Sequence, residues 1–362
     1  MRRERGKKMD KDKAAKRVIV FIGIVLALAI LKIGASVVIP FAIAIFVFML
    51  VSPLMEKFNR MRVPAVLSTA LILLFTTLFC LCFVYVIVAM INVLVAELPT
   101  YLNKVTVFDE YISSWIRGLF NIDRDDFPSI ITMLNIDWAQ YVKNILSTLS
   151  SASASIVGDV AMVIVYLLFL LMEESTIFPK IHAAFPESKQ EASVLVRTIA
   201  QQTSRYLSVK ILISLATGAC FYLIAILSGM DFPLVWGVLA FLLNFIPTIG
   251  SIVVTILATF MAAIQFMPHW STVILVFFGF LATEMVLGNV IDPKLQGAQL
   301  NMSPLVILIM LAIWGYIWGI AGMFLAVPIT CVFQVVCATV PSLKPVSILL
   351  SSGGQLGRSE EE

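Results

Sequence analysis

Eight long apolar blocks constrain this chain more than any other feature of its sequence. A helix needs about 20 mostly apolar residues to cross about 30 Å of hydrocarbon. Of the 362 residues, 60% are apolar and only 13% are charged, whereas soluble proteins carry about 25% charged residues. The composition therefore argues against a soluble enzyme and predicts an all-α polytopic membrane protein. The blocks are residues 18–31, 33–51, 66–96, 156–172, 209–228, 233–267, 271–290 and 304–338.

Two of these blocks have an unusual length. Residues 233–267 and 304–338 are too long for one span and too short for two, since 35 residues folded in half reach only about 25 Å at about 1.5 Å per residue. We therefore predict about six full spans and two re-entrant helical hairpins. Non-helical backbone survives at membrane depth only where protein or water satisfies it, so the breaks are candidates for a substrate path. The candidate residues are Asn244, Pro247 and Gly250 in the first hairpin and Gly315, Gly319 and Gly322 in the second.

These hairpin residues also have simpler interpretations. Asn244 could serve a substrate or cap loose backbone next to the break. Proline removes a backbone donor and glycine accepts turn geometry, which is why the breaks are expected there. Gly315 and Gly319 lie four residues apart in an apolar block, a spacing that also permits close helix packing.

The distribution of basic residues predicts that both termini are cytoplasmic. Residues 1–17 hold nine basic side chains against three acidic ones, and a basic flank beside an apolar block indicates the cytoplasmic side rather than nucleic-acid binding. If the first two blocks form a pair that turns near Lys32, the basic loop 52–65 also lies inside. The alternative is one long helix over residues 18–51 with a kink at Pro40, which places that basic loop outside.

This topology divides the chain into six parts. The second half contains two spans that are each followed by a hairpin opening with Pro-Leu-Val, at residues 233 and 304. Inverted repeats of this kind place binding sites near the midplane of transporters, although a shared preference for proline at helix starts explains the similarity equally well. The parts are a basic cytoplasmic N-terminus (1–17), N-terminal transmembrane helices (18–96), an extracytoplasmic segment of short amphipathic helices (97–155), a transmembrane helix with a cytoplasmic amphipathic helix (156–208), a transport core of two span-plus-hairpin repeats (209–338) and a cytoplasmic tail (339–362).

Charged residues near the seventh block are the candidates for ion coupling. Glu284 is surrounded by apolar sequence, and a charge at the centre of a membrane helix costs about 2.5 to 3.5 kcal/mol. Its carboxylate could bind a proton or cation, or could be protonated and bonded to a neighbouring helix. Asp292 follows at i+8 on the same predicted helix face, and Asn289 and Lys294 lie beside it in the sequence. These three residues could form a gate or a solvated cytoplasmic turn. Lys210, near a span end, is expected to extend its amine to the membrane surface.

Motifs for other chemistries are missing from the sequence. The two histidines, His182 and His269, are too far apart in sequence to suggest a metal site. All five cysteines fall in apolar stretches, which argues against a disulfide framework. The sequence contains no Walker phosphate loop, HExxH or GxSxG motif. We therefore predict a protein that is not an enzyme and that uses neither a cofactor nor a metal.

Several motifs resemble the autoinducer-2 exporter (AI-2E) family of prokaryotic permeases. The resemblance extends over about residues 18–340 and is carried by residues 288–297, 302–306, 314–328, 244–250, 38–64 and 205–210. It implies a multi-pass transporter of the bacterial inner membrane that forms homo-oligomers. Some members of the family look like exporters of autoinducer-2, and others like sodium or lithium/proton antiporters.

The sequence thus leads to one expected function and two alternatives. We expect a secondary transporter that exports a small polar solute such as autoinducer-2 and is coupled to a proton or sodium gradient. A monovalent cation/proton antiporter is the first alternative. The second is a membrane scaffold or sensor without transport, whose external segment binds a partner.

Overall fold

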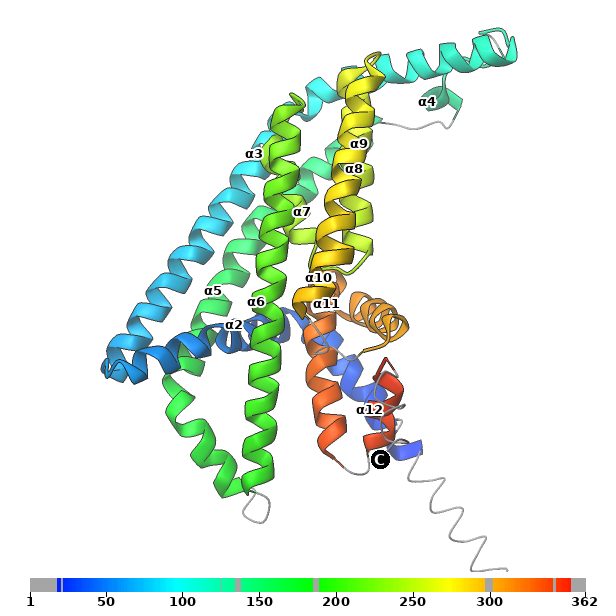
Figure 1. The fold of residues 1–362 in the computed structure, drawn as a ribbon. Coiled ribbons are helices and arrows are strands. Elements are labelled where there is room, and N and C mark those ends of the chain that lie inside the picture. The colour runs from blue at the N-terminus through cyan, green and yellow to red at the C-terminus, as the bar shows by residue number, and fades with distance from the viewer. Residues whose placement is uncertain are drawn as a thin grey trace, which may run out of the picture. The chain divides into compact units, whose positions relative to one another are not determined.

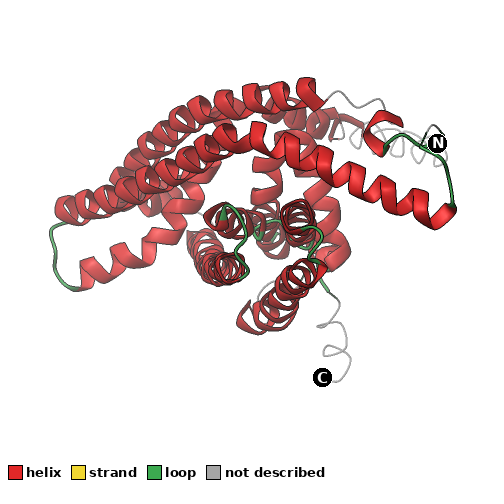
Figure 2. Cartoon of the chain, turned by 90° about the horizontal axis from the view of Figure 1, so that it is seen from above, coloured by secondary structure: helices red, strands yellow, loops and turns green. Residues whose placement is uncertain are grey.

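The computed structural model describes residues 18–20, 22–124, 126–133, 138–184, 189–296, 302–340 and 343–352. Within these ranges the regular elements are helices, joined by short loops (Figure 2). Seven of them are long and apolar enough to cross a membrane. This finding confirms the prediction of an all-α polytopic membrane protein. The basic segment 1–17 and the last ten residues of the predicted tail lie outside the described residues.

The N-terminal helices follow the predicted apolar blocks. A short apolar helix, Val18–Ile33, and α2 (Ala35–Arg60) are separated by a turn at Gly34. The turn lies where the sequence predicted that the first two blocks would separate. Pro40, where the alternative prediction placed a kink, lies within α2 and does not end it.

The segment 97–155 differs from the prediction of separate short amphipathic helices. Helix α3 (Ala65–Phe120) continues through Pro99, and α5 (Trp138–Ala184) begins well before its apolar block, so that only α4 (Ile130–Met133) is short (Figure 1). A single proline removes one backbone donor and here does not end the helix. Helix α3 ends where Asn121 adopts φ 52°, and the backbone N–H of Asn121 donates to the carbonyl oxygen of Arg117. The prediction was wrong because the helical pattern continues beyond the membrane span.

A similar continuation joins two parts that the sequence analysis separated. Helix α6 (Lys189–Leu227) runs without a break through residues 208 and 209. The predicted cytoplasmic amphipathic helix and the following span are therefore one helix. The polar residues in the first half of α6 therefore belong to the same helix as the residues within the span.

The C-terminal half contains both predicted helix breaks. Helices α7 (Pro233–Leu243) and α8 (Ile249–Phe266) are separated at residues 244–248. Helix α9 (Trp270–Val286) continues into a π-helix, η1 (Leu287–Ile291), and then α10 (Asp292–Gln296). Helix α11 (Pro304–Thr339) is interrupted at Gly319, and α12 (Lys344–Leu350) follows it. Helices α7 and α11 both have proline in their first turn.

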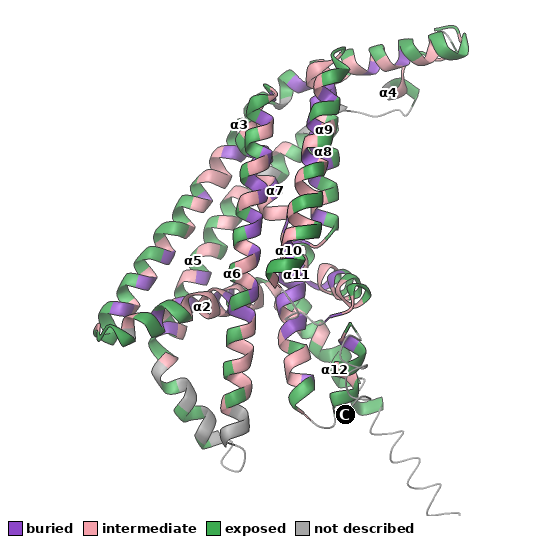
Figure 3. Ribbon diagram, in the orientation of Figure 1, coloured by how far each residue is buried: buried purple, intermediate pink, exposed green. Residues whose placement is uncertain are grey.

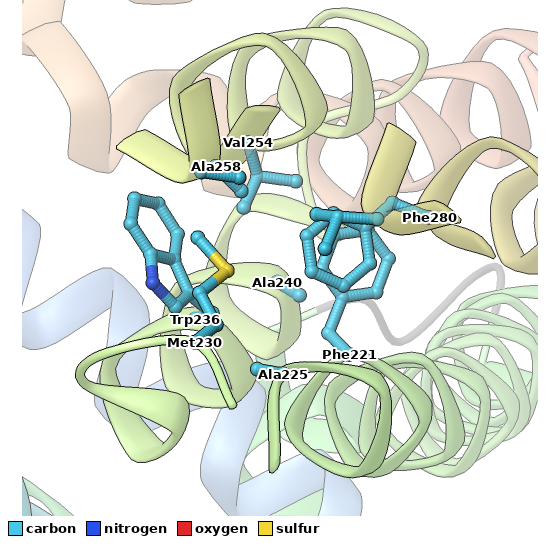
Figure 4. Packing of buried hydrophobic residues seen from close by; sticks show 10 residues of the cluster. Phe221, Ala225, Met230, Trp236, Ala240, Val254, Ala258 and Phe280 are labelled. Carbon is cyan, nitrogen blue, oxygen red and sulfur yellow. The ribbon is translucent and has the colours of Figure 1, made fainter. Parts of the chain in front are cut away.

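The chain divides into two compact units. One comprises residues 1–48, 165–199 and 301–362, and the other comprises residues 49–164 and 200–300. In the first unit, the indole N–H of Trp318 donates to the carbonyl oxygen of Leu31 at 2.9 Å, and Phe41 packs edge-on against Tyr166. The second unit holds the core shown in Figure 4, where the rings of Phe221 and Phe280 stack with centroids 4.1 Å apart.

Small residues allow the helices of the second unit to pack closely around this core. Ala225, Ala240 and Ala258 are fully buried beside the stacked rings. A Cβ atom on Gly218 of α6 would lie 2.7 Å from the carbonyl oxygen of Gly237 of α7, so the two backbones touch. Close backbone contact through small residues is the usual packing mode inside membranes, because lipid tails are as apolar as side chains.

Burial separates interior helices from those that face the surroundings. In the most apolar stretch of α6, α8 and α11, 39% of residues are buried, against 17% in α2, α3 and α5 and 11% in the span from α9 to α10; Figure 3 shows the burial along each helix. Apolar side chains of α3 such as Leu74, Phe75 and Leu78 are largely exposed. Such exposed faces are expected for helices in contact with lipid. Buried polar side chains are therefore more informative than the average burial of a helix.

Candidate functional site

A buried ion pair connects α6 with α10 in the second unit. The ammonium of Lys210 lies 3.0 Å from Oδ2 of Asp292, and the two side chains are only 6% and 13% exposed. The side-chain amide of Gln296 donates to the other carboxylate oxygen of Asp292. The expectation that Lys210 extends to the membrane surface is therefore wrong, because its amine is held in the interior by a carboxylate. The solvated-turn interpretation of Asp292 also fails, since this residue is buried.

Glu284 provides a third charged group near this ion pair. Its carboxylate lies on α9, where it interacts with the side chain of Ser251 on α8 and with the charge of Lys210. Among the described residues, Oε1 of Glu284 is buried without a hydrogen-bond partner. Gly288 keeps the space beside the carboxylate open, since a Cβ there would lie 3.3 Å from Oε2. The ammonium of Lys210 thus pairs directly with Asp292 and acts on Glu284 through its charge.

The helix between the two carboxylates is not a regular α-helix. The π-helix Leu287–Ile291 directly precedes Asp292, whose backbone N–H donates to the carbonyl oxygen of Leu287 five residues earlier. The spacing predicted from the sequence between Glu284 and Asp292 was that of a regular α-helix. The π-turn was therefore not predicted. Single π-turns inside α-helices are rare and often occur at functional sites.

Asn244 links the first helix break to the same face of α6. It ends α7, is buried, and donates its side-chain amide to the hydroxyl of Ser214 at 2.9 Å. Ser214 lies four residues after Lys210, so the two side chains share one face of α6. The side chain of Asn244 therefore joins the break to α6, rather than capping the local backbone.

Two residues that follow Asn244 in the chain, Thr248 and Gly250, make the first break a tight turn. Thr248 has a left-handed φ of 58°, which is unfavourable for a β-branched residue. The backbone at Gly250 packs directly on the backbone of Leu243, so that an added Cβ would overlap it. Pro247, which directly precedes Thr248, has no N–H to donate. The break predicted at residues 244–250 is therefore present as a sharp turn between α7 and α8.

The second break lies in the first unit and has a related geometry. Gly319 has φ 61° and ψ −140°, a region that is essentially open only to glycine. The backbone at Gly322 packs on the backbone of Trp314, and a Cβ on Gly315 would lie 3.1 Å from the side chain of Met323. Residues eight apart in a straight helix are about 12 Å apart along its axis. These contacts therefore require a sharp change of direction at Gly319.

The remaining candidates are placed differently. Asn289 and Lys294 are exposed, whereas Lys210 and Asp292 are buried and Glu284 is half-buried. Ser214, Ser251 and Gln296 were not predicted from the sequence, and the role predicted for Lys210 was wrong. The available signal was Lys210 and Ser214, which lie one turn apart in the apolar second half of α6. They mark a polar face of α6 inside the span.

A second polar cluster lies where α3 leaves its apolar stretch. Tyr101, which is 4% exposed, donates its hydroxyl to the carboxylate of Asp231 in the loop between α6 and α7. Lys104 lies 3.1 Å from the same carboxylate oxygen. Gln265 of α8 accepts a hydrogen bond from the backbone N–H of Asp231 at 2.8 Å. Burial raises the pKa of Tyr101, and the hydrogen bond to Asp231 raises it further. The cluster fastens α3 to the loop before α7.

Removing the hydroxyl of Tyr101 should weaken the contact between α3 and the loop before α7. We expect Tyr101→Phe to lower the free energy of unfolding by about 1 kcal/mol, because it deletes one hydrogen bond to a charged but partly exposed carboxylate. Thermal unfolding of the purified protein in detergent measures the change. Tyr111→Phe, on the same helix, is the control, because Tyr111 is 38% exposed. Equal unfolding temperatures for both variants would contradict this role of Tyr101.

Metal binding has no support in the described residues. Within the described part of the chain, no three His, Cys, Asp or Glu side chains come together in a way that could hold a metal ion. The five cysteines are free thiols.

Comparisons with known proteins agree with the membrane architecture. Residues 19–342 match the model of the protein family described as "AI-2E family transporter". A Borreliella burgdorferi protein named "Putative transport protein" is 32% identical over 335 residues, which cover 92% of this chain and 88% of that protein. The AI-2 transport protein TqsA of Escherichia coli K12 is 27% identical over 92% of this chain and 95% of its own length. The chain therefore belongs to the AI-2E transporter family.

Proposed function

We propose that this protein is a secondary transporter that exports a small polar solute such as autoinducer-2 and draws on a proton or sodium gradient. The observation that carries the proposal is the buried cluster of Lys210, Asp292 and Glu284 beside the break between α7 and α8. Ionisable groups inside a membrane are costly and mark ion or substrate pathways. Family membership supports transport, and the name of the similar protein TqsA supports autoinducer-2 as the solute to test first.

Each of the two helix breaks is a proposed substrate contact within its own unit. Backbone groups freed near Pro247 and Gly250 in one unit, and near Gly315, Gly319 and Gly322 in the other, can pair with a small polar solute. Broken helices supply substrate sites in other transporters for the same reason. The proposed setting is the bacterial inner membrane, with both termini in the cytoplasm and the protein as a homo-oligomer.

Glu284 is the first residue proposed to take part in ion coupling. Glu284→Gln keeps the shape of the side chain but cannot ionise, so we expect it to reduce gradient-driven export at least tenfold. The measurement is the ratio of internal to external autoinducer-2 in cells that make the wild type, the variant or neither. Glu173→Gln is the control, because Glu173 forms an exposed ion pair with Lys180. Export by Glu284→Gln at the wild-type rate would exclude the coupling role.

Monovalent cation/proton exchange is the second candidate function. The observation that favours it is the excess of carboxylates over ammonium in the buried cluster, which suits a small cation without any organic solute. If all the cells above show the same autoinducer-2 ratio, sodium or lithium is added to inverted membrane vesicles that contain a pH-sensitive dye. A protein-dependent change of internal pH supports exchange. No flux in either assay favours the scaffold or sensor and contradicts both transport proposals.

A further inference from the structure

The ion pair between Lys210 and Asp292 leaves the nearby carboxyl group of Glu284 without a direct ionic partner among the described residues. Two carboxylates, of Asp292 and Glu284, stand against one ammonium. We propose that Lys210 is an internal cation that the transported ion displaces: its ammonium holds the carboxylates when no ion is bound, and an entering proton or monovalent cation takes its place. This inference rests on the proposed function and assigns the residue that links the ion to the helices.

Burial argues that the pair has a role other than stability. Both side chains are nearly removed from solvent, at 6% and 13% exposure. The cost of desolvating two charges commonly cancels their attraction, so a buried ion pair is weak evidence for stabilisation. A pair of neutral residues of similar volume would hold α6 to α10 about as well. The charge of Lys210 is therefore a candidate for a role in ion binding.

Lys210 also has a possible second partner. Lysine carries a compact charge with three donors on a flexible four-carbon stem, so its amine can be shared between acceptors. Oδ1 of Asp292 already accepts the amide of Gln296, whereas Oε1 of Glu284 is a buried acceptor with no partner among the described residues. When an ion neutralises Asp292, Glu284 is the free acceptor for the ammonium.

The surroundings contain few other charges that could take over this role. Helices α7 and α8 carry no ionisable side chain. On α6 and α10, the nearest other charged residues are Arg205 and Lys294, and both are exposed. With both carboxylates ionised the cluster has one excess negative charge, so one proton or one monovalent cation neutralises it.

Two structural features would transmit the displacement of the Lys210 ammonium to the backbone. Ser214, one turn from Lys210, receives the amide of Asn244 at the start of the break between α7 and α8. The π-helix Leu287–Ile291 lies between the two carboxylates, and its wide turn can convert to α-helix by a shift of hydrogen bonds. Movement of the Lys210 amine thus acts at one helix break and at one irregular turn.

The first test measures coupling in liposomes that contain the purified full-length protein. The probes are radiolabelled sodium and protons, with uptake driven by an imposed pH gradient. Lys210→Met with Asp292→Asn removes both charges at similar volume and should fold like the wild type by size-exclusion chromatography. We expect the gradient-driven component to fall at least tenfold, and Lys210→Arg to retain part of it. The matched control is Lys180→Met with Glu173→Gln, which removes an exposed ion pair and should leave uptake unchanged.

The outcomes separate this inference from the proposed function. Unchanged gradient dependence in the Lys210→Met, Asp292→Asn protein would overturn the role of Lys210 while leaving ion-coupled transport intact. A wild type without any gradient-driven sodium, proton or autoinducer-2 movement would instead overturn the proposed function, and this inference with it.

A second test does not require flux. Thermal unfolding is followed while sodium replaces choline at constant ionic strength. Lys210→Met exposes the carboxylates to added cations, so we expect half-maximal stabilisation at a sodium concentration at least tenfold lower than in the wild type. The double variant should lose this gain because Asp292 is neutralised. Equal sodium dependence in the wild type and Lys210→Met would contradict the displacement of Lys210 by an ion.

Discussion

Alanine at Gly250 or at Gly322 is expected to abolish transport. A Cβ at Gly250 would overlap the backbone of Leu243, and one at Gly322 would overlap the backbone of Trp314. These obstacles are backbone atoms, which cannot rotate away as a side chain can. Overpacking commonly costs about 1 to 3 kcal/mol and sometimes more. We expect each turn to open and flux to fall at least a hundredfold.

The control for this prediction is a glycine on an open helix face. Gly158 of α5 has nothing within 4 Å of the position where a Cβ would be added. Gly158→Ala should therefore transport normally, and it should gain up to about 1 kcal/mol from the better helix propensity of alanine. Flux is measured together with the amount of folded protein in the membrane. Wild-type flux in Gly250→Ala or Gly322→Ala would show that the tight turns are not required.

Loss of the Lys210 charge alone should strongly destabilise the second unit. Lys210→Met leaves the carboxylate of Asp292 buried without its counter-ion, and breaking a buried pair costs about 3 to 5 kcal/mol. Asp292→Asn should cost a similar amount, because it strands the ammonium. The combined variant should recover most of the loss, since neither charge is then left unpaired.

A double-mutant cycle measures this effect. The unfolding temperatures of the wild type, both single variants and the combined variant are compared in the same detergent. A large positive coupling is expected because the two residues are in direct contact at 3.0 Å. If the losses of the single variants simply add in the combined variant, the ion pair does not exist in solution. Such additivity would remove the basis of the proposed exchange.

The turns at the two breaks were predictable because their causes are local. Pro and Gly weaken a helix locally, so a break was expected somewhere near them in each block of 35 residues, although Pro328 remains helical within α11. The breaks at 244–248 and at Gly319 accordingly lie inside the predicted windows. Whether these turns re-enter the membrane is a separate prediction, because it depends on the bilayer as well as on the chain.

The buried cluster could not be predicted in the same way. Lys210 and Asp292 are 82 residues apart, and their contact exists only because α6 and α10 meet. From position in the sequence, a lysine near the end of a span is expected to reach for water. Glu284 was identifiable as an unusual charge, but its neighbours Ser251 and Lys210 were not.

The sequence by itself determined that the chain is helical and membrane-spanning, and where two of its helices break. The reason is that a bilayer requires every spanning segment to satisfy its own backbone hydrogen bonds, so length and apolarity are enough to predict the spans. Only the tertiary structure decided how far α3, α5 and α6 extend beyond their spans and which charges meet. Those features depend on contacts between helices that are distant in sequence, which no local pattern records.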